Sequence, residues 1–125
     1  MFLLTYRTCK LLQNLIDNPW RCSANNDHYD MCEKLQEMID AIFLREGLED
    51  NIYFRAAAHI TFDEDNRVIY ASHISIASKD PEVVLGDIKR MKITGKEAVF
   101  EMTDEYNDRA AFKSISMVVI DDEVV

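Results

Sequence analysis

The segment that decides the fold is IYFRAAAHITFDEDNRVIYASHISI, residues 52–76, in which apolar side chains recur at alternate positions. The even-numbered residues from Ile52 to Phe62 are all apolar, and the even set continues with Val68, Tyr70, Ile74 and Ile76. A period of two is typical of a strand that buries one of its faces. The segment therefore predicts two strands whose even-numbered side chains face the core.

The connection between these two strands has the chemistry of a tight hairpin loop. Even positions can lie opposite even positions only if the loop has an odd length, which Glu64–Asn66 satisfies by closing Asp63 against Arg67. A loop of three residues needs a left-handed third residue, and asparagine tolerates that conformation better than most residues. The sequence predicts an antiparallel hairpin with Asn66 in the left-handed region.

Helical periodicity dominates the chain before residue 47. Apolar residues from Phe2 to Asp17 form one stripe, and Asn18-Pro19 ends it because the residue before a proline avoids the helical region. A second stripe begins at an N-cap, Asn26 or Asp27, and ends at Gly47, a left-handed helix exit. We expect two antiparallel helices joined by a short loop.

The C-terminal half predicts a short helix and three further strands. Asp80-Pro81-Glu82 is typical of a helix start, and Gly86 is expected to end that helix, although the alternative is a helix that continues to Lys92. The expected strands are 88–94, 97–103 and 112–120, with a turn at Gly95. The predicted fold is a single α+β domain over residues 1–125, with an N-terminal helical hairpin packed on a curved antiparallel sheet of about five strands and a short helix between strands two and three.

The charge balance limits the class of partner. The chain has 23 acidic and 14 basic residues, a formal net charge of −9. Such a field repels nucleic acid and anionic membranes, and it attracts basic surfaces. The three cysteines form no secreted disulfide pattern, and the first residues are too short an apolar run for a signal peptide, so we expect a cytoplasmic protein.

Zinc is the first chemistry to weigh. Cys22, His28 and Cys32 lie close together in the sequence, and Cys9 could join them from the facing helix. The tight Cys-x-x-Cys pairs of structural zinc sites are absent from the sequence, however. We predict no metal and no cofactor, with Cys9 and Cys32 serving as small core residues and His28 as a solvated residue at a helix start.

Two histidines form a second candidate site. In the predicted register Ala57 faces His73 and His59 faces Ala71, so the histidines are diagonal neighbours on the odd-numbered face, ~7–8 Å apart in the backbone. Tyr53 and Arg55 share that face. These residue types could line a small-molecule pocket or support acid–base chemistry, given a carboxylate such as Glu101 to orient one ring.

Acidic clusters form the third candidate. In a simple meander the turn residues 63–65 and the C-terminal residues 121–123 lie at the same end of the sheet. Their negative charge would then make one docking rim for a basic protein. The predicted partner-binding residues are Asp63, Glu64, Asp65, Asp121, Asp122 and Glu123.

The odd-numbered sheet face is also unusually apolar for a surface that the helices leave uncovered. Its apolar residues are Ile69, Val99, Ile115, Met117 and Val119, beside small Ala57, Ala71 and Ala77. A surface of this kind needs a ligand, a partner or a second copy of the chain. We therefore predict a homodimer through the sheet.

Together these features favour a non-enzymatic acidic binding protein, such as an inhibitor, a modulator or an immunity-type partner, that docks on a basic protein surface. One alternative is a pocket protein or enzyme that uses the His59/His73 face. A second alternative is a structural subunit of an oligomer. No catalytic motif in the sequence favours the enzyme class.

Overall fold

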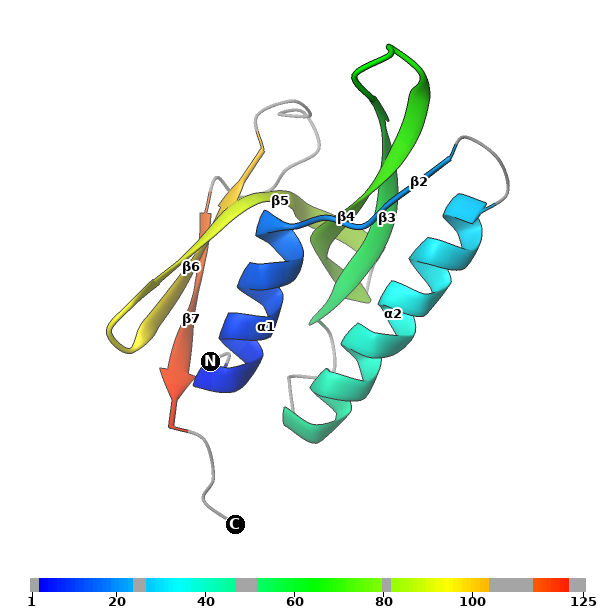
Figure 1. Ribbon diagram of the computed structural model, residues 1–125. Coiled ribbons are helices and arrows are strands. Elements are labelled where there is room, and N and C mark those ends of the chain that lie inside the picture. Colours follow the sequence, from blue (N-terminus) through cyan, green and yellow to red (C-terminus); the bar gives the residue numbers. More distant parts are fainter. Residues whose placement is uncertain (1–2, 24–26, 47–51, 80–81, 104–113, 122–125) are drawn as a thin grey trace.

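The computed structural model describes residues 3–23, 27–46, 52–79, 82–103 and 114–121, and within these ranges the chain forms an α+β fold (Figure 1). Two helices accompany a mixed sheet of seven strands. The elements in chain order are β1 (Leu3–Thr5), α1 (Tyr6–Asp17), β2 (Arg21–Ser23), α2 (Asp27–Glu46), β3 (Ile52–Phe62), β4 (Val68–Lys79), β5 (Glu82–Thr94), β6 (Glu97–Met102) and β7 (Ser114–Ile120).

The β3–β4 hairpin has the predicted register along its whole length. The ladder pairs Ile52 with Ser78 at one end and Phe62 with Val68 at the other. Asp63 N donates to Arg67 O at 3.0 Å, and Asn66 adopts a left-handed φ of 61°. The three-residue loop is therefore confirmed, and even-numbered residues of both strands share one face.

The sheet order is β1-β7-β6-β5-β4-β2, with β3 paired to the other edge of β4. One edge of β4 is shared, because β2 pairs with residues 69–71 and β5 pairs with residues 75–79. The sheet is mixed because β1 runs parallel to β7. The expected antiparallel sheet of five strands is thus right only in part, since it lacks the three-residue strands β1 and β2.

The first helix begins later than predicted. Leu3–Thr5 extends as β1 along β7, which buries Leu4 opposite Val119. Thr5 then caps α1, because its Oγ1 accepts a hydrogen bond from the Thr8 backbone N–H at 3.2 Å. The predicted end at Asp17 is confirmed, with Asn18 as the C-cap residue.

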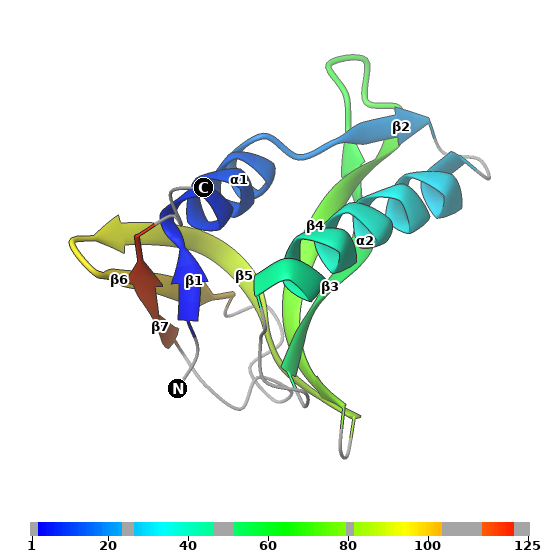
Figure 2. The same cartoon turned by 90° about the horizontal axis from the view of Figure 1, so that it is seen from below.

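The two helices are not joined by a short loop, because β2 lies between them. Two hydrogen bonds between Trp20, the residue before β2, and Ser72 of β4 strengthen the pairing of β2 with β4. Ser72 N donates to Trp20 O at 2.7 Å, and Trp20 N donates to Ser72 Oγ at 2.8 Å. Both helices still pack on the same side of the sheet (Figure 2). Among the described residues, neither helix is long and apolar enough to cross a membrane.

The predicted short helix between strands two and three is wrong, because residues 82–86 belong to β5; Asp80 and Pro81 lie outside the described residues. Gly86 is not a helix end. A Cβ at this position would lie 2.6 Å from Met102 Cγ, so the glycine allows β5 and the Met102 side chain to approach closely. The predicted turn at Gly95 is confirmed, with a φ of 59°.

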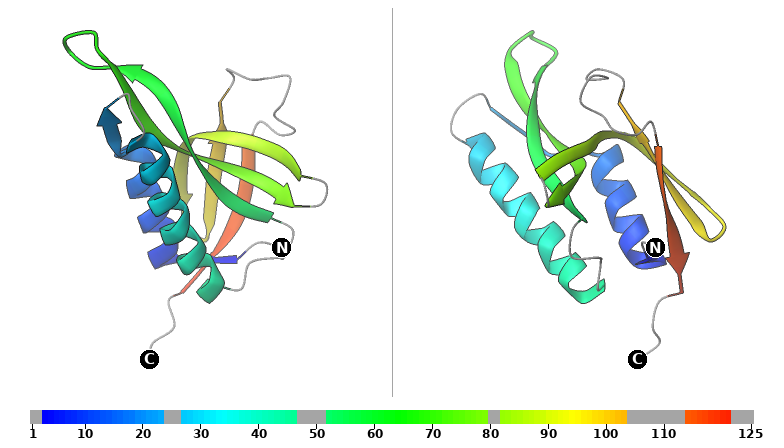
Figure 3. Two further views of the ribbon diagram at one scale, coloured as in Figure 1. Left: turned by 90° about the vertical axis from the view of Figure 1, so that its right-hand side faces the viewer. Right: turned by 180° about the vertical axis from the view of Figure 1, so that it is seen from behind.

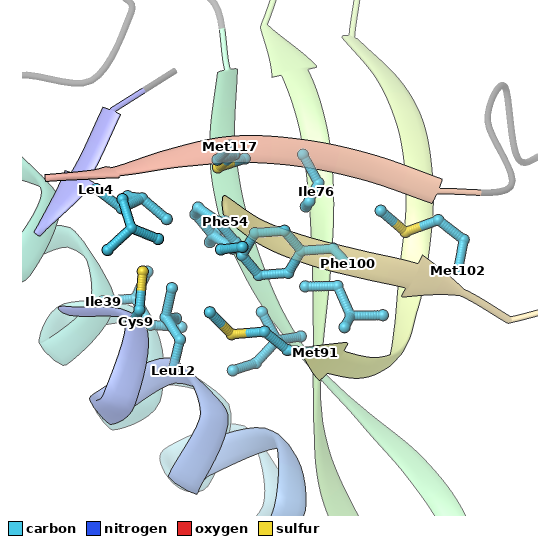
Figure 4. Close-up of a cluster of buried hydrophobic side chains, with 14 of the residues drawn as sticks. Leu4, Cys9, Leu12, Ile39, Phe54, Ile76, Met91, Phe100, Met102 and Met117 are labelled. Atoms are coloured by element: carbon cyan, nitrogen blue, oxygen red, sulfur yellow. The ribbon is translucent and has the colours of Figure 1, made fainter. Parts of the chain in front are cut away.

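β5 joins two halves of a strongly bent sheet, and the helices fill the angle between the halves (Figure 3). Phe54 on β3 meets Phe100 on β6 across this angle, with ring centroids 5.6 Å apart. Figure 4 shows residues of α1, α2 and both sheet halves around these rings. Gln36 of α2 also secures the outer edge of β3: its Nε2 donates to Phe54 O at 2.9 Å, and its Oε1 accepts from Ala56 N at 2.8 Å.

The odd-numbered residues of β7 belong to this core and not to the outer face. Met117 pairs with Ala98 and Ile115 pairs with Phe100, which places odd positions of β7 beside even positions of β6. Met117 and Val119 are buried, and Ile115 packs against the core. Three of the five apolar residues that suggested a dimer face, Ile115, Met117 and Val119, therefore pack inside the same chain. The homodimer remains a prediction, but these three residues no longer support it.

Gly86→Ala is expected to destabilise the protein, because the new methyl group would overlap the Met102 side chain in a closed part of the core. Overpacking of this kind costs roughly 1–3 kcal/mol of the free energy of unfolding. Urea denaturation followed by circular dichroism measures the loss. Met102→Ala in the same chain should recover part of it in a double-mutant cycle.

Gly95→Ala is the matched control, because nothing lies within 4 Å of its Cβ position and only the positive φ opposes the substitution. Met102→Ala should leave the cost of Gly95→Ala unchanged. Wild-type stability of the Gly86→Ala variant would show that β5 and Met102 are not in close contact.

Candidate functional site

His59 on β3 and His73 on β4 lie side by side, as the predicted register requires. Ala57 pairs with His73 and His59 pairs with Ala71, so the two imidazoles meet diagonally across the ladder. Their ring centroids are 4.0 Å apart and the ring planes are almost perpendicular, at 85°. The small alanine side chains opposite each ring leave room for this close contact.

Asp87 of β5 completes a cluster that the sequence analysis missed. Its Oδ1 lies 3.6 Å from His73 Nε2, and the two side chains are 22% and 18% exposed. One ligand atom each from His59, His73 and Asp87 fall within 4.8 Å of one another. Glu101, the carboxylate considered from the sequence, instead lies with its Oε2 2.7 Å from Arg90 Nε.

The position of Asp87 is fixed by the change of partner along β5. Asp87 pairs with Ser75 of β4, whereas Ile88 pairs with Met102 of β6. The Asp87 carbonyl also accepts a hydrogen bond from Thr103 N at 2.8 Å. Predicting one continuous strand through Gly86 would have placed Asp87 on the same sheet face as the histidines. The predicted helix that ended at Gly86 hid this position of Asp87.

Tyr53 and Arg55, the other two predicted pocket residues, occupy the same odd-numbered face farther along β3. Arg55 pairs with Ser75, and Ser75 pairs with Asp87 on its other side, so these three residues form one row across β3, β4 and β5. Tyr53 lies in the next row, opposite Ala77. The four residues predicted from the sequence thus share a face, although Arg55 is exposed and the histidines are half-buried.

The acidic clusters are not brought together. The turn after β3 and the end of β7 lie at opposite ends of the molecule (Figure 1). The strands β3 to β7 do pair in the order of an antiparallel meander, but β5 arches from one sheet half to the other, so the end of β7 does not lie beside the turn after β3 (Figure 1). Asp121 is exposed after β7, whereas Asp122 and Glu123 lie outside the described residues.

Asp63 has a structural role in the turn. Its Oδ1 accepts hydrogen bonds from Asp65 N at 2.9 Å and from Arg67 N at 2.8 Å. A carboxylate that holds two backbone N–H groups fixes the loop conformation. The exposed Glu64 and Asp65 therefore stand on a firmly closed turn.

The residues first weighed as zinc ligands have other surroundings. Cys9 is buried in the apolar core, and His28 stacks on Tyr70 with ring centroids 4.3 Å apart. Burial raises the pKa of the Cys32 thiol, and the charge interaction with Cys22 raises it further. The pKa of the Cys22 thiol is also raised, first by burial and then by the negative charge of Asp27. A raised pKa favours the thiol over the thiolate that binds metals.

The cluster of His59, His73 and Asp87 has the atoms for two kinds of chemistry. Imidazole and carboxylate groups in contact can exchange protons with a ligand, and the same donors bind transition metal ions. Both uses depend on half-buried side chains held by three hydrogen-bonded strands, which this site provides. Comparisons of the chain with models of protein families, with curated proteins and with solved structures find no match.

The raised pKa values of Cys22 and Cys32 predict slow alkylation at pH 8, because only the thiolate reacts. The rate for each should rise with pH through a midpoint above the ordinary range for cysteine. Mass spectrometry of iodoacetamide-labelled peptides measures both rates, with the urea-unfolded chain as the reference. A midpoint below that of the unfolded chain would contradict the burial of these thiols.

Proposed function

We propose that this protein is an acidic binding protein that docks on another protein through the far end of the β3–β4 hairpin. The observation that carries the proposal is a row of large apolar side chains left exposed there. Ile60 is 62% exposed, Phe62 is 59% exposed and Val68 is 41% exposed. We call these three residues the hairpin patch.

The hairpin patch is continuous because the strand register makes it so. Phe62 pairs with Val68, and Ile60 pairs with Tyr70, on the even-numbered face of both strands. Nearer the body of the protein this face packs under α2, but the hairpin extends past the helices (Figures 1 and 3). Adjacent exposed apolar residues on a projecting element are typical of an interaction surface.

The surface continues onto α2 through aromatic contacts. Tyr70 stacks on His28, and the His28 ring lies 3.9 Å from the ring of Tyr29, measured between centroids. Tyr29 is itself mostly exposed. Tyrosine is enriched among the residues that dominate binding energy, because it buries a large area at a low cost in side-chain entropy.

Charge indicates the kind of partner. Glu64 and Asp65 are exposed at the turn beside the hairpin patch, and the chain as a whole has a net charge of −9. An apolar groove edged by lysine or arginine would complement both features, with the charges mainly speeding association. The turn is already closed by Asp63 and Asn66, so little conformational entropy would be lost on docking.

The docking surface assigned here is narrower than the one expected from the sequence. Glu64 and Asp65 contribute to it directly, and Asp63 supports their loop. Asp121 directly follows β7, whose end lies far from the turn after β3 (Figure 1), so it would contact a partner only through a second surface. Two alternatives remain as secondary proposals. One is a small-molecule pocket or enzyme site at His59 and His73, and the other is a structural subunit of an oligomer.

A photo-crosslinking amino acid at position 62 tests this function. Illumination in a lysate of the producing cells should crosslink the chain to a basic protein. The yield of this crosslinked complex should decrease at high salt. The same amino acid at position 11 is the matched control, because Leu11 is also large, apolar and exposed, but lies on α1. Equal crosslinking from both positions would contradict a specific hairpin surface.

Ile60→Ser and Phe62→Ser then measure the contribution of the hairpin patch to the affinity for the crosslinked protein. Loss of a central apolar contact costs about 2 kcal/mol, so each variant should raise Kd by roughly 30-fold. Glu64→Gln with Asp65→Asn should slow association several-fold at low salt only. Unchanged Kd values in the serine variants would overturn the proposal.

A further inference from the structure

We propose that His59, His73 and Asp87 form a binding site for a divalent first-row transition metal ion such as zinc. The three side chains come from β3, β4 and β5, and their ligand atoms converge within 4.8 Å of one another. Within the described parts of the chain this is the one group of three histidine, cysteine or acidic residues with such a convergence.

The distances fit a metal site better than a direct hydrogen bond. His73 Nε2 and Asp87 Oδ1 are 3.6 Å apart, which exceeds the usual N–H···O range of 2.7–3.2 Å. Two ligands bound tetrahedrally to zinc at about 2.1 Å are separated by about 3.4 Å. The pair therefore already has nearly the spacing of two zinc ligands, and the third ligand atom, within 4.8 Å of the other two, would have to move closer.

Sharing one ion would require the two rings to move apart, because imidazoles that bind one tetrahedral ion through nitrogens at about 2.1 Å have ring centroids about 5 Å apart. The imidazole planes of His59 and His73 are almost perpendicular at a centroid distance of 4.0 Å, so the rings meet edge to face rather than stack. Two histidines from neighbouring strands commonly bind one ion through a single nitrogen each.

The backbone holds the three ligands before any ion arrives. His59 and His73 belong to an uninterrupted ladder of eleven pairs, and Asp87 is anchored by its pairing with Ser75 and by the Thr103 N–H. Ligands on paired strands lose little freedom on binding, which raises affinity. The site is also half-buried, so water screens its charges less than at an open surface.

The donor set selects the class of ion. Two imidazole nitrogens and one carboxylate oxygen suit zinc, cobalt, nickel or iron, whereas calcium and magnesium prefer oxygen ligands alone. Three protein ligands leave at least one coordination position for water or a small anion. This site faces away from the hairpin patch, because His59 is odd-numbered and Ile60 and Phe62 are even-numbered.

Isothermal titration of zinc or cobalt into the EDTA-treated full chain tests the site. A Cys22→Ser/Cys32→Ser background removes the two partly exposed thiols as competing ligands. We expect one ion per chain with a Kd of about 10 μM or tighter, and a rise in Tm of about 5–10 °C at a hundredfold excess over Kd. The cobalt complex should show visible d–d absorption without a sulfur charge-transfer band.

His73→Ala and Asp87→Asn should each weaken binding by at least about 100-fold while the circular dichroism spectrum stays unchanged. His28→Ala is the matched control, because His28 stacks on Tyr70 outside the cluster, and it should bind as the background chain does. No zinc or cobalt binding below 100 μM in the background chain would overturn the proposal. Equal loss in the His28→Ala variant would overturn it as well.

Discussion

The register of the β3–β4 ladder is the constraint on which the rest of the structure depends. Side chains on a strand alternate between faces, so a slip of one residue would exchange the two faces completely. If β3 shifted, its residue Phe54 would leave the core and His59 would enter it. The turn prevents such a slip, because the Asp63 carboxylate and the left-handed Asn66 fit one loop length only.

β5 is the second constraint, because it belongs to both halves of the sheet. Its first part pairs with β4 and its second part pairs with β6, with a register shift in each ladder. Shifts of this kind bend a strand and increase its twist. The bend lets Phe54 meet Phe100 across the core, and it also brings Asp87 to the histidines. Core packing and the candidate metal site therefore share one cause.

Local sequence patterns predicted the elements whose stability is local. The period of two in residues 52–62, the three-residue loop and the turn at Gly95 follow from the residues themselves, and so does the end of α1 before Pro19. The strands β1 and β2 could not be predicted in this way. Each has three residues and exists because β7 or β4 offers an open edge, which is a tertiary interaction.

The errors at the site have the same origin. Gly86 has the residue type of a helix end, and its real role depends on Met102, which is 16 positions away in the sequence. The face of β7 was misassigned because odd positions there pair with even positions of β6, an offset that no local pattern reveals. The contact between His59 and His73 was predictable from one ladder, whereas Asp87 required knowledge of a second ladder.

The two proposed surfaces lie back to back on one hairpin, and this arrangement limits how they could influence each other. Ile60 and His59 are consecutive residues on opposite faces, so an ion held by β3, β4 and β5 would connect the hairpin near its turn to the rest of the sheet. It would not touch the residues that meet a partner. Coupling between sites is reciprocal and requires a difference in affinity between two conformations. An ion could therefore strengthen docking only by reducing the motion of the hairpin, and a partner would tighten ion binding by the same factor.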